Sequence, residues 1–143
     1  AAVIGSAALA AAAINTLEGG LFGGHGDVAI LGYDSVAYFT EGKAVKGQDN
    51  FVFEWMGAKW KFASRAYLEQ FKASPQQYAP QYGGYCAYGV SQGNLVKVEP
   101  EQFTLIDGKL YLNYDASVQA TWLKDSAGYI RSADAKFAPL LKK

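Results

Sequence analysis

The stretch that decides the fold is Phe-Val-Phe-Glu-Trp-Met-Gly-Ala-Lys-Trp-Lys-Phe, residues 51–62. Its first five residues alternate between two faces, as a half-buried β-strand does. Gly57 and Ala58 fit the two-residue loop of a type II′ turn, in which glycine comes first. This turn predicts a β-hairpin with four aromatic rings on one face, in which the opposite residues are Trp55 and Trp60, Phe53 and Phe62, and Glu54 and Lys61.

A helix is expected directly after this hairpin. Ser64 is its predicted N-cap, because a serine hydroxyl accepts a hydrogen bond from a free N–H group of the first helical turn. The helix runs through Lys72, and Pro75 stops it. We expect its apolar stripe to lie across the aromatic face of the hairpin, and the stripe consists of Tyr67, Leu68 and Phe71.

A second hairpin is predicted over residues 103–113, where Asp107-Gly108 is a strong signal for a type I′ turn. Asp115 can cap a further helix, and a last helix is expected over residues 130–141, interrupted or ended near Pro139. Strands and helices are mixed without a strict β-α-β order, which predicts an α+β domain with a small antiparallel sheet built from hairpins and with packed helices. The expected inward residues are Phe103, Leu105, Leu110 and Leu112 in the hairpin, and Val118 and Trp122 in the helix.

Composition limits the functions to consider. The chain has 143 residues, of which 50% are hydrophobic, enough for one domain with a real core. Thirteen basic and thirteen acidic residues cancel, and the basic ones are scattered, so we expect no nucleic-acid partner. A single cysteine excludes an internal disulfide and a C-x-x-C metal knuckle. No internal repeat is evident in the sequence.

The N-terminus differs from the rest of the chain, because residues 1–17 carry no charge. Three interpretations stay open: the apolar core of an export signal, part of a membrane-spanning or membrane-lying helix, and an Ala-rich helix packed on its own domain. We therefore expect an apolar N-terminal helix, signal-derived or anchoring, at residues 1–18 and a glycine-rich joint at 19–26. The main domain follows at 27–126, and a C-terminal helix at 127–143 packs on it.

Five short motifs follow one another between residues 28 and 124. They are Gly-Tyr-Asp-Ser-Val-Ala-Tyr-Phe (32–39), Trp-Lys-Phe-Ala-Ser (60–64), Phe-Lys-Ala-Ser-Pro-Gln-Gln-Tyr (71–78), Tyr-Gly-Gly-Tyr-Cys-Ala-Tyr-Gly-Val (82–90) and Leu-Tyr-Leu-Asn (110–113). In this order they resemble the motifs of the YHS family, and the last two look like its longer, exported branch. The resemblance implies a small stand-alone exported domain. It also implies a metal-binding role, with copper often suggested, for versions that carry paired cysteines.

This chain departs from the cysteine-bearing pattern of that family. Ala37 and Ala63 stand where two of its cysteines would be, and Ala66 or Tyr67 falls near a third. Thiolate ligands select copper(I) and zinc, so these replacements weaken the metal prediction that the resemblance carries.

Cys86, framed by glycines, is the first candidate for chemistry. It is a small buried residue, a contact for a metal or ligand, or a nucleophile, and the last role needs a base or positive charge nearby. His25, far upstream, is either a surface imidazole or a metal ligand. Asp34 is either a cap for a turn or the following segment, or a carboxylate in a site shared with Cys86. The predicted ligand-binding residues are Tyr33, Asp34, Tyr85 and Cys86, and the predicted metal ligands are Cys86, Asp34 and His25.

The sequence therefore predicts a non-catalytic binding module in the periplasm or another extracytoplasmic compartment. Its expected ligand is a small molecule or a metal ion, either copper or another transition metal. The alternative is an accessory or structural subunit that residues 1–17 tether to a membrane or a membrane-protein complex. A thiol enzyme that uses Cys86 is the third hypothesis.

Overall fold

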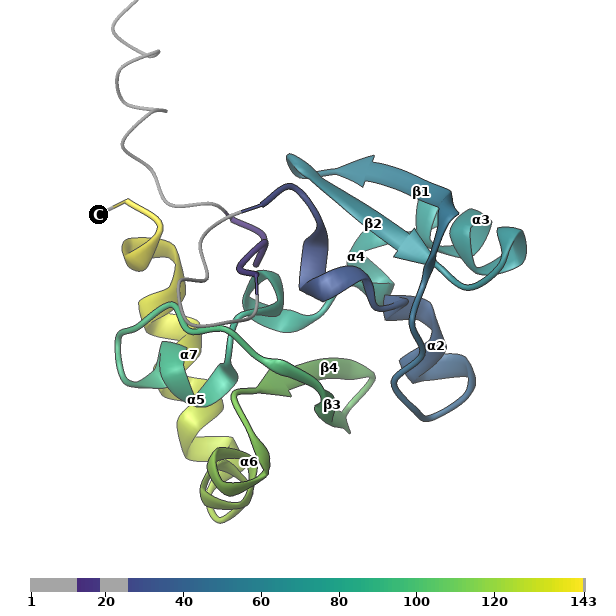
Figure 1. Ribbon diagram of the computed structural model, residues 1–143. Coiled ribbons are helices and arrows are strands. Elements are labelled where there is room, and N and C mark those ends of the chain that lie inside the picture. Colours follow the sequence, from purple (N-terminus) through teal and green to yellow (C-terminus); the bar gives the residue numbers. More distant parts are fainter. Residues whose placement is uncertain (1–12, 19–25, 143) are drawn as a thin grey trace, which may run out of the picture.

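The computed structural model describes residues 13–18 and 26–142. Within these residues the chain forms an α+β fold with two antiparallel hairpins, six α-helices and two short 3-10 helices (Figure 1). The predicted fold class is confirmed. The apolar helix predicted for residues 1–18 lies mostly outside the described residues, and its described part, residues 13–18, is not helical. His25 and all but the last residue of the predicted joint at 19–26 also lie outside them.

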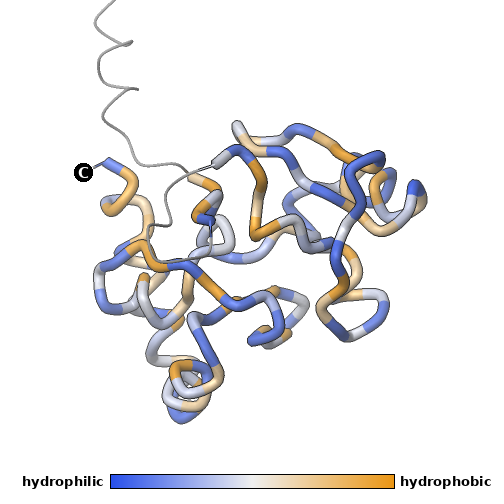
Figure 2. Tube along the Cα trace, viewed as in Figure 1, coloured by the Kyte–Doolittle hydropathy of each residue, from blue (hydrophilic) through white to orange (hydrophobic). Residues whose placement is uncertain are grey.

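The first half of the fold occupies one side of Figure 1. Figure 2 shows apolar segments in this half and in the other, so both halves contribute apolar residues. The elements of the first half are η1 (Ala29–Gly32), α2 (Ser35–Thr40), β1 (Gln48–Trp55), β2 (Ala58–Phe62), α3 (Arg65–Ala73) and α4 (Pro75–Tyr78).

The second half lies beside the first (Figure 1). Tyr38 of α2 joins the two, because its buried hydroxyl donates to the carbonyl of Pro100, 2.8 Å away, and its ring centroid lies 4.9 Å from that of Phe103. The elements of the second half are η2 (Gln81–Gly84), α5 (Ala87–Ser91), β3 (Glu99–Ile106), β4 (Lys109–Asn113), α6 (Ala116–Leu123) and α7 (Ser126–Leu140).

The first hairpin forms, but its predicted register was wrong. Met56 and Gly57 make the turn, and both have positive φ (53° and 78°), as a type I′ turn requires. Every pair is therefore shifted by two residues. Because side chains alternate with a period of two, this shift leaves the rings on their predicted face. The observed pairs are Trp55 with Ala58, Glu54 with Lys59, and Phe53 with Trp60.

Helix α3 closes the aromatic face of this hairpin, as predicted. The Ser64 hydroxyl accepts from the N–H of Tyr67, and the helix ends at Ala73, one residue later than expected. Leu68 and Phe71 are buried. The Phe71 ring centroid lies 5.0 to 6.2 Å from those of the surrounding rings, which belong to Phe53, Trp55, Trp60 and Phe62.

The second hairpin has the predicted Asp107-Gly108 turn, with φ of 52° and 74°. Leu110 and Leu112 are buried, but the prediction for Leu105 was wrong, since 39% of it is exposed. Burial is unequal between the two strands: β4 is buried on both faces, Tyr111 included, whereas most residues of β3 are only partly buried or exposed.

The caps of the last two helices follow ordinary local chemistry. Asp115 accepts from the N–H of Val118, as predicted, and Trp122 is fully buried. The last helix begins at Ser126 rather than residue 130, because Asp125 caps it by accepting from the N–H of Gly128. Pro139 lies inside the final turn of this helix and does not interrupt it; the helix ends at Leu140, which confirms the predicted end near Pro139.

The two halves repeat one arrangement that the sequence did not reveal. Each has a 3-10 segment whose last three residues have positive φ, then a short helix, a hairpin and a capped helix. The hairpins match in strand lengths, turn and pairing, with a break in register after the first pair in both. Gln48 pairs with Phe62 and Val52 with Lys61 in the first; Glu99 pairs with Asn113 and Phe103 with Leu112 in the second.

The correspondence extends to the packing of the helix on each hairpin. Trp60 and Phe71 have ring centroids 5.0 Å apart with an interplanar angle of 30°. Tyr111 and Trp122, at the equivalent positions, are 5.3 Å apart at 40°. All four side chains are buried. The fold is thus two related units of the same order, η–α–β–β–α.

Candidate functional site

Asp34 is the N-cap of α2 and is fully buried. Its Oδ1 accepts from the N–H groups of Val36 (2.9 Å) and Ala37 (3.1 Å), and its Oδ2 accepts from the N–H of Ala63 (2.7 Å). The cap prediction is confirmed, and the same carboxylate also ties α2 to the residue after β2. Burial raises the pKa of Asp34, although the three N–H donors act in the opposite direction.

Cys86 is the N-cap of α5 and is 1% exposed. Its Sγ accepts from the N–H of Gly89 at 3.3 Å, and its thiol donates to Oδ1 of Asn113 at 3.5 Å. Burial raises the pKa of this thiol, against backbone hydrogen bonds from Gly89, Tyr114 and Tyr88. The thiol therefore stays protonated at neutral pH, and a protonated thiol is a poor nucleophile.

Asp34 and Cys86 occupy the same place in the two units. Each follows the 3-10 segment and caps the short helix. Their own N–H groups donate to matching carbonyls, Val45 at 2.8 Å and Val96 at 2.9 Å. The side-chain hydrogen bonds of Asp34 and Cys86 share no residue, so the two groups belong to separate networks, one in each unit.

The two predicted tyrosines also occupy matching positions, with different surroundings. The hydroxyl of Tyr33 donates to Glu101 at the surface, 3.0 Å away, and this bond is the main cause that raises its pKa. Tyr85 is fully buried, and its hydroxyl donates to the carbonyl of Ile14 at 3.4 Å. Burial raises the pKa of Tyr85. Tyr85 thus contacts the N-terminal segment at Ile14.

The donor groups at Asp34 and Cys86 do not fit a transition metal. Copper and zinc sites in proteins use several thiolate, imidazole or carboxylate ligands together. The Asp34 oxygens accept backbone N–H groups, and the polar side chain bonded to Cys86 is the amide of Asn113. Across residues 13–18 and 26–142 there is no group of three or more His, Cys, Asp or Glu placed to hold a metal ion.

A pocket of about 340 Å³ opens beside Cys86. Gly89 lets the Val96 side chain pack close against α5 in the wall of this pocket, since a Cβ there would come within 2.8 Å of the Val96 side chain. Of the predicted ligand-binding residues, Cys86 is the one that lines this pocket. The sequence singled out two of the other lining residues, Tyr88 as one of several tyrosines able to line a pocket and Val118 as a core residue. The remaining lining residues were missed, and no sequence signal marks them as a group; they are Gly89, Gln92, Asn94, Val96 and Tyr114.

Two other concavities have a different character. One, of about 320 Å³, has a mixed lining of polar and apolar surface, and the ion pair between Lys61 and Asp49 (2.7 Å) lies in its wall. The other, of about 440 Å³, is wider and lies between Trp55 of β1 and Phe137 of α7. Of these three concavities, the pocket beside Cys86 is the one lined by a predicted site residue.

In the described part of the chain, no helix combines the length and the apolar character needed to cross a membrane. Comparisons of the chain with protein-family models, with curated proteins and with solved structures found no match.

Proposed function

We propose that this protein is a non-catalytic binding module of the YHS type that holds a small ligand in the pocket beside Cys86. The observation that carries this proposal is the pocket itself, which is open, about 340 Å³ in volume and lined mainly by apolar surface. Ligand pockets in proteins are typically concave and apolar with a few polar groups. The YHS assignment rests on the order of the sequence motifs, and the extracytoplasmic location rests on the uncharged residues 1–17.

Binding suits this site better than thiol chemistry. A catalytic thiol needs a lowered pKa and access to its substrate. Burial raises the pKa of Cys86, which is 1% exposed, and the lining residues of the pocket include no base or cation beside the thiol. We expect iodoacetamide to alkylate Cys86 at pH 7.5 more than tenfold more slowly in the folded protein than in urea, as followed by mass spectrometry. Equal rates would support the enzyme hypothesis.

Methyl NMR tests the ligand site directly. A library of neutral small molecules is titrated into the protein, and the methyl resonances of Val96 and Val118 are followed, with Val52 of β1 as the control. Saturable shifts confined to Val96 and Val118 support the proposal. A library that shifts neither residue, or shifts all three alike, overturns it.

The metal prediction that the resemblance implies has its own test. Metal content is measured by mass spectrometry on protein purified from its native membrane or periplasm, beside a Cys86→Ala variant. Near-equimolar copper, zinc or iron that disappears in the variant would show that the ligand is a metal ion. Metal-free protein in both preparations would leave the organic ligand as the proposal.

The second candidate function is an accessory subunit tethered through the N-terminus, and one set of contacts favours it. Asn15 is buried and bonds to both units: its N–H donates to Gly83, its Nδ2 donates to Gly84, and its carbonyl accepts from Ile30. The uncharged stretch therefore continues into a segment that is fixed on the domain.

The tip of the first hairpin adds an exposed apolar residue close to this segment. Met56 is 57% exposed and lines a concavity together with Ala13 and Ile14. If the full chain docks on a bilayer here, Met56→Glu should weaken co-sedimentation with phosphatidylcholine vesicles severalfold. Full-length protein that stays monomeric and does not sediment with vesicles would remove this candidate.

A further inference from the structure

The walls of the pocket beside Cys86 have counterparts in the first unit. The correspondence follows from the matched N-caps, hairpins and backbone hydrogen bonds of the two units. From the N-cap of the short helix to the start of the hairpin the second unit is one residue shorter, because α5 has five residues and α2 has six. Residues of the short helix are therefore matched by counting from the N-cap, and later residues by counting from the hairpin. The equivalent pairs are Cys86 and Asp34, Tyr88 and Val36, Gly89 and Ala37, Gln92 and Thr40, Val96 and Val45, and Val118 and Tyr67.

The pair Val118 and Tyr67 is fixed by the same hydrogen bond in both units. The N–H of Tyr67 donates to the hydroxyl of Ser64, the N-cap of α3, at 3.2 Å. The N–H of Val118 donates to Oδ1 of Asp115, the N-cap of α6, at 2.8 Å. The backbones therefore present these two side chains in the same direction, towards the short helix of their own unit.

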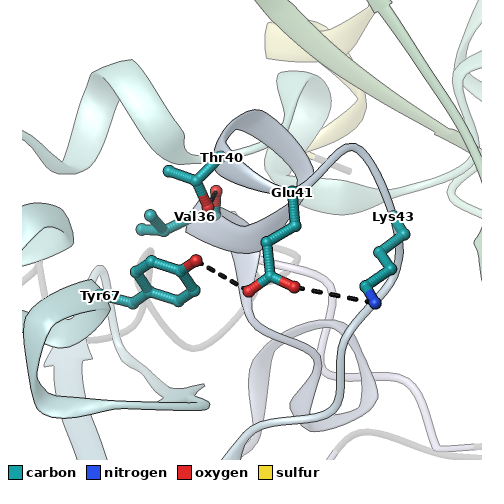
Figure 3. Close-up of polar contacts among 5 residues, drawn as sticks. All are labelled: Val36, Thr40, Glu41, Lys43 and Tyr67. Carbon is teal, nitrogen blue, oxygen red and sulfur yellow. Dashed lines mark hydrogen bonds and ion pairs between the residues drawn. The ribbon is translucent and has the colours of Figure 1, made fainter.

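In the first unit an aromatic ring fills this place. The ring of Tyr67 lies beside Val36 and Thr40 of α2, and its hydroxyl donates to Oε2 of Glu41 at 2.7 Å (Figure 3). Glu41 is held in turn by Lys43, 3.9 Å away. In the first unit this place is therefore occupied by a phenol ring of the chain itself, the side chain of Tyr67, whose hydroxyl is hydrogen-bonded.

In the second unit the ring is missing and the pocket opens instead. Val118 stands at the position of Tyr67, and it lines the pocket together with Tyr88 and Gln92, which stand at the positions of Val36 and Thr40. Cavities of about 150 Å³ already bind a benzene molecule in other proteins. A pocket of about 340 Å³ has room for one substituted ring.

The chemistry of the lining residues limits which class of ligand fits the pocket. The lining residues carry no charge, so a neutral molecule avoids an unpaired buried ion. Gln92 and Asn94 lie in the lining and bring amide groups that can accept from or donate to a hydroxyl. Tyr88 and Tyr114 bring ring faces and edges, which favour an aromatic partner.

We propose that the pocket beside Cys86 binds a small neutral phenol, whose ring takes the place that Tyr67 fills in the first unit. This inference rests on the proposed function, because it names the ligand class of the same pocket. The suitable probe is 4-methylphenol, which is the side chain of tyrosine as a free molecule.

Reciprocal substitutions test the inference. In the wild-type protein 4-methylphenol should shift the methyl resonances of Val96 and Val118 and leave those of Val36 and Val45 unchanged. Val118→Tyr supplies the ring covalently, so it should weaken 4-methylphenol binding at least tenfold and raise Tm. Tyr67→Val opens the counterpart place in the first unit, so 4-methylphenol should then also shift Val36 and Val45, with a stoichiometry of two.

The outcomes separate this inference from the function on which it rests. If another neutral molecule shifts Val96 and Val118 but 4-methylphenol and phenol do not, the phenol inference is wrong and the binding module stands. If no molecule shifts them, both fail. Cyclohexanol is the control for the ring, and binding equal to that of 4-methylphenol counts against an aromatic site. Should Val118→Tyr fail to fold, Val118→Leu must still weaken 4-methylphenol binding, and unchanged affinity would overturn the inference.

Discussion

The two units place different side chains on one backbone arrangement, and the difference is largest at Asp34 and Cys86. The carboxylate of Asp34 accepts hydrogen bonds from three backbone N–H groups. At the equivalent position Cys86 has a neutral thiol, whose sulfur accepts from the N–H of Gly89. The first unit is also closed by its own Tyr67, while the second has Val118 and an open pocket. The comparison teaches that the first unit carries structural contacts where the second has space for a ligand.

The helix cores test whether the two units contribute equally to stability. Phe71 and Trp122 are both fully buried at equivalent positions. Phe71→Ala should lower the free energy of unfolding by about 3 to 5 kcal/mol, because it removes a large ring and leaves a cavity. Trp122→Ala should cost a similar amount. Urea unfolding followed by far-UV circular dichroism measures both, and a cost below about 1 kcal/mol for either variant would show that its unit is not part of the cooperative core.

The cost in unfolding free energy of replacing the capping residue should differ more between the two units than the cost of replacing the core residue. Asp34→Ala leaves three N–H groups without their acceptor and should lower the free energy of unfolding by about 3 kcal/mol. Cys86→Ala removes a weaker sulfur acceptor and should cost about 1 kcal/mol. The control is Asp49→Ala, an exposed carboxylate whose loss should change stability by less than about 0.5 kcal/mol. Equal losses of unfolding free energy for Asp34→Ala and Cys86→Ala would contradict the prediction that the Asp34 cap contributes more to stability than the Cys86 cap.

Substitutions in the two hairpin turns should change the free energy of unfolding least. Met56 and Asp107 both adopt positive φ as the first central residue of a type I′ turn. Asn and Asp tolerate this conformation better than an unbranched apolar residue does. Met56→Asn should therefore raise the free energy of unfolding by about 0.5 kcal/mol, and Asp107→Met should lower it by about the same amount. Thermal unfolding of the two variants checks the prediction, which is wrong if both shift Tm in the same direction.

Features that depend on a few neighbouring residues were predictable from the sequence. Ser64 and Asp115 cap their helices because their oxygens reach an N–H three residues ahead. Asp107-Gly108 forms its turn because both residue types accept positive φ. Met56 carries no such signal, so the turn was placed one residue too late, with Gly57 first. The predicted register of the first hairpin was wrong, but its side chains lie on the predicted faces because the shift was two residues.

The candidate site was less predictable, because its residues come from distant parts of the chain. Cys86 was singled out for its glycine-rich surroundings, and the structure places it at the pocket. Tyr33, Asp34 and Tyr85 were grouped with it by motif, but their hydrogen bonds lead to Glu101, to the start of α2, and to Ile14. The spacing of motifs along a chain does not specify which side chains meet in space.

The sequence alone determined the α+β class, the aromatic face of the first hairpin and the helix caps at Ser64 and Asp115, since period-two alternation and cap chemistry act over a few residues. The tertiary structure decided that two halves of different sequence share one backbone arrangement. It also decided that Asp34 and Cys86 are equivalent, and that the position of Tyr67 is held by Val118 beside an open pocket. The physical reason is that one set of hydrogen bonds and buried rings can be made by many residue types, so the repeat is kept in geometry and not in sequence.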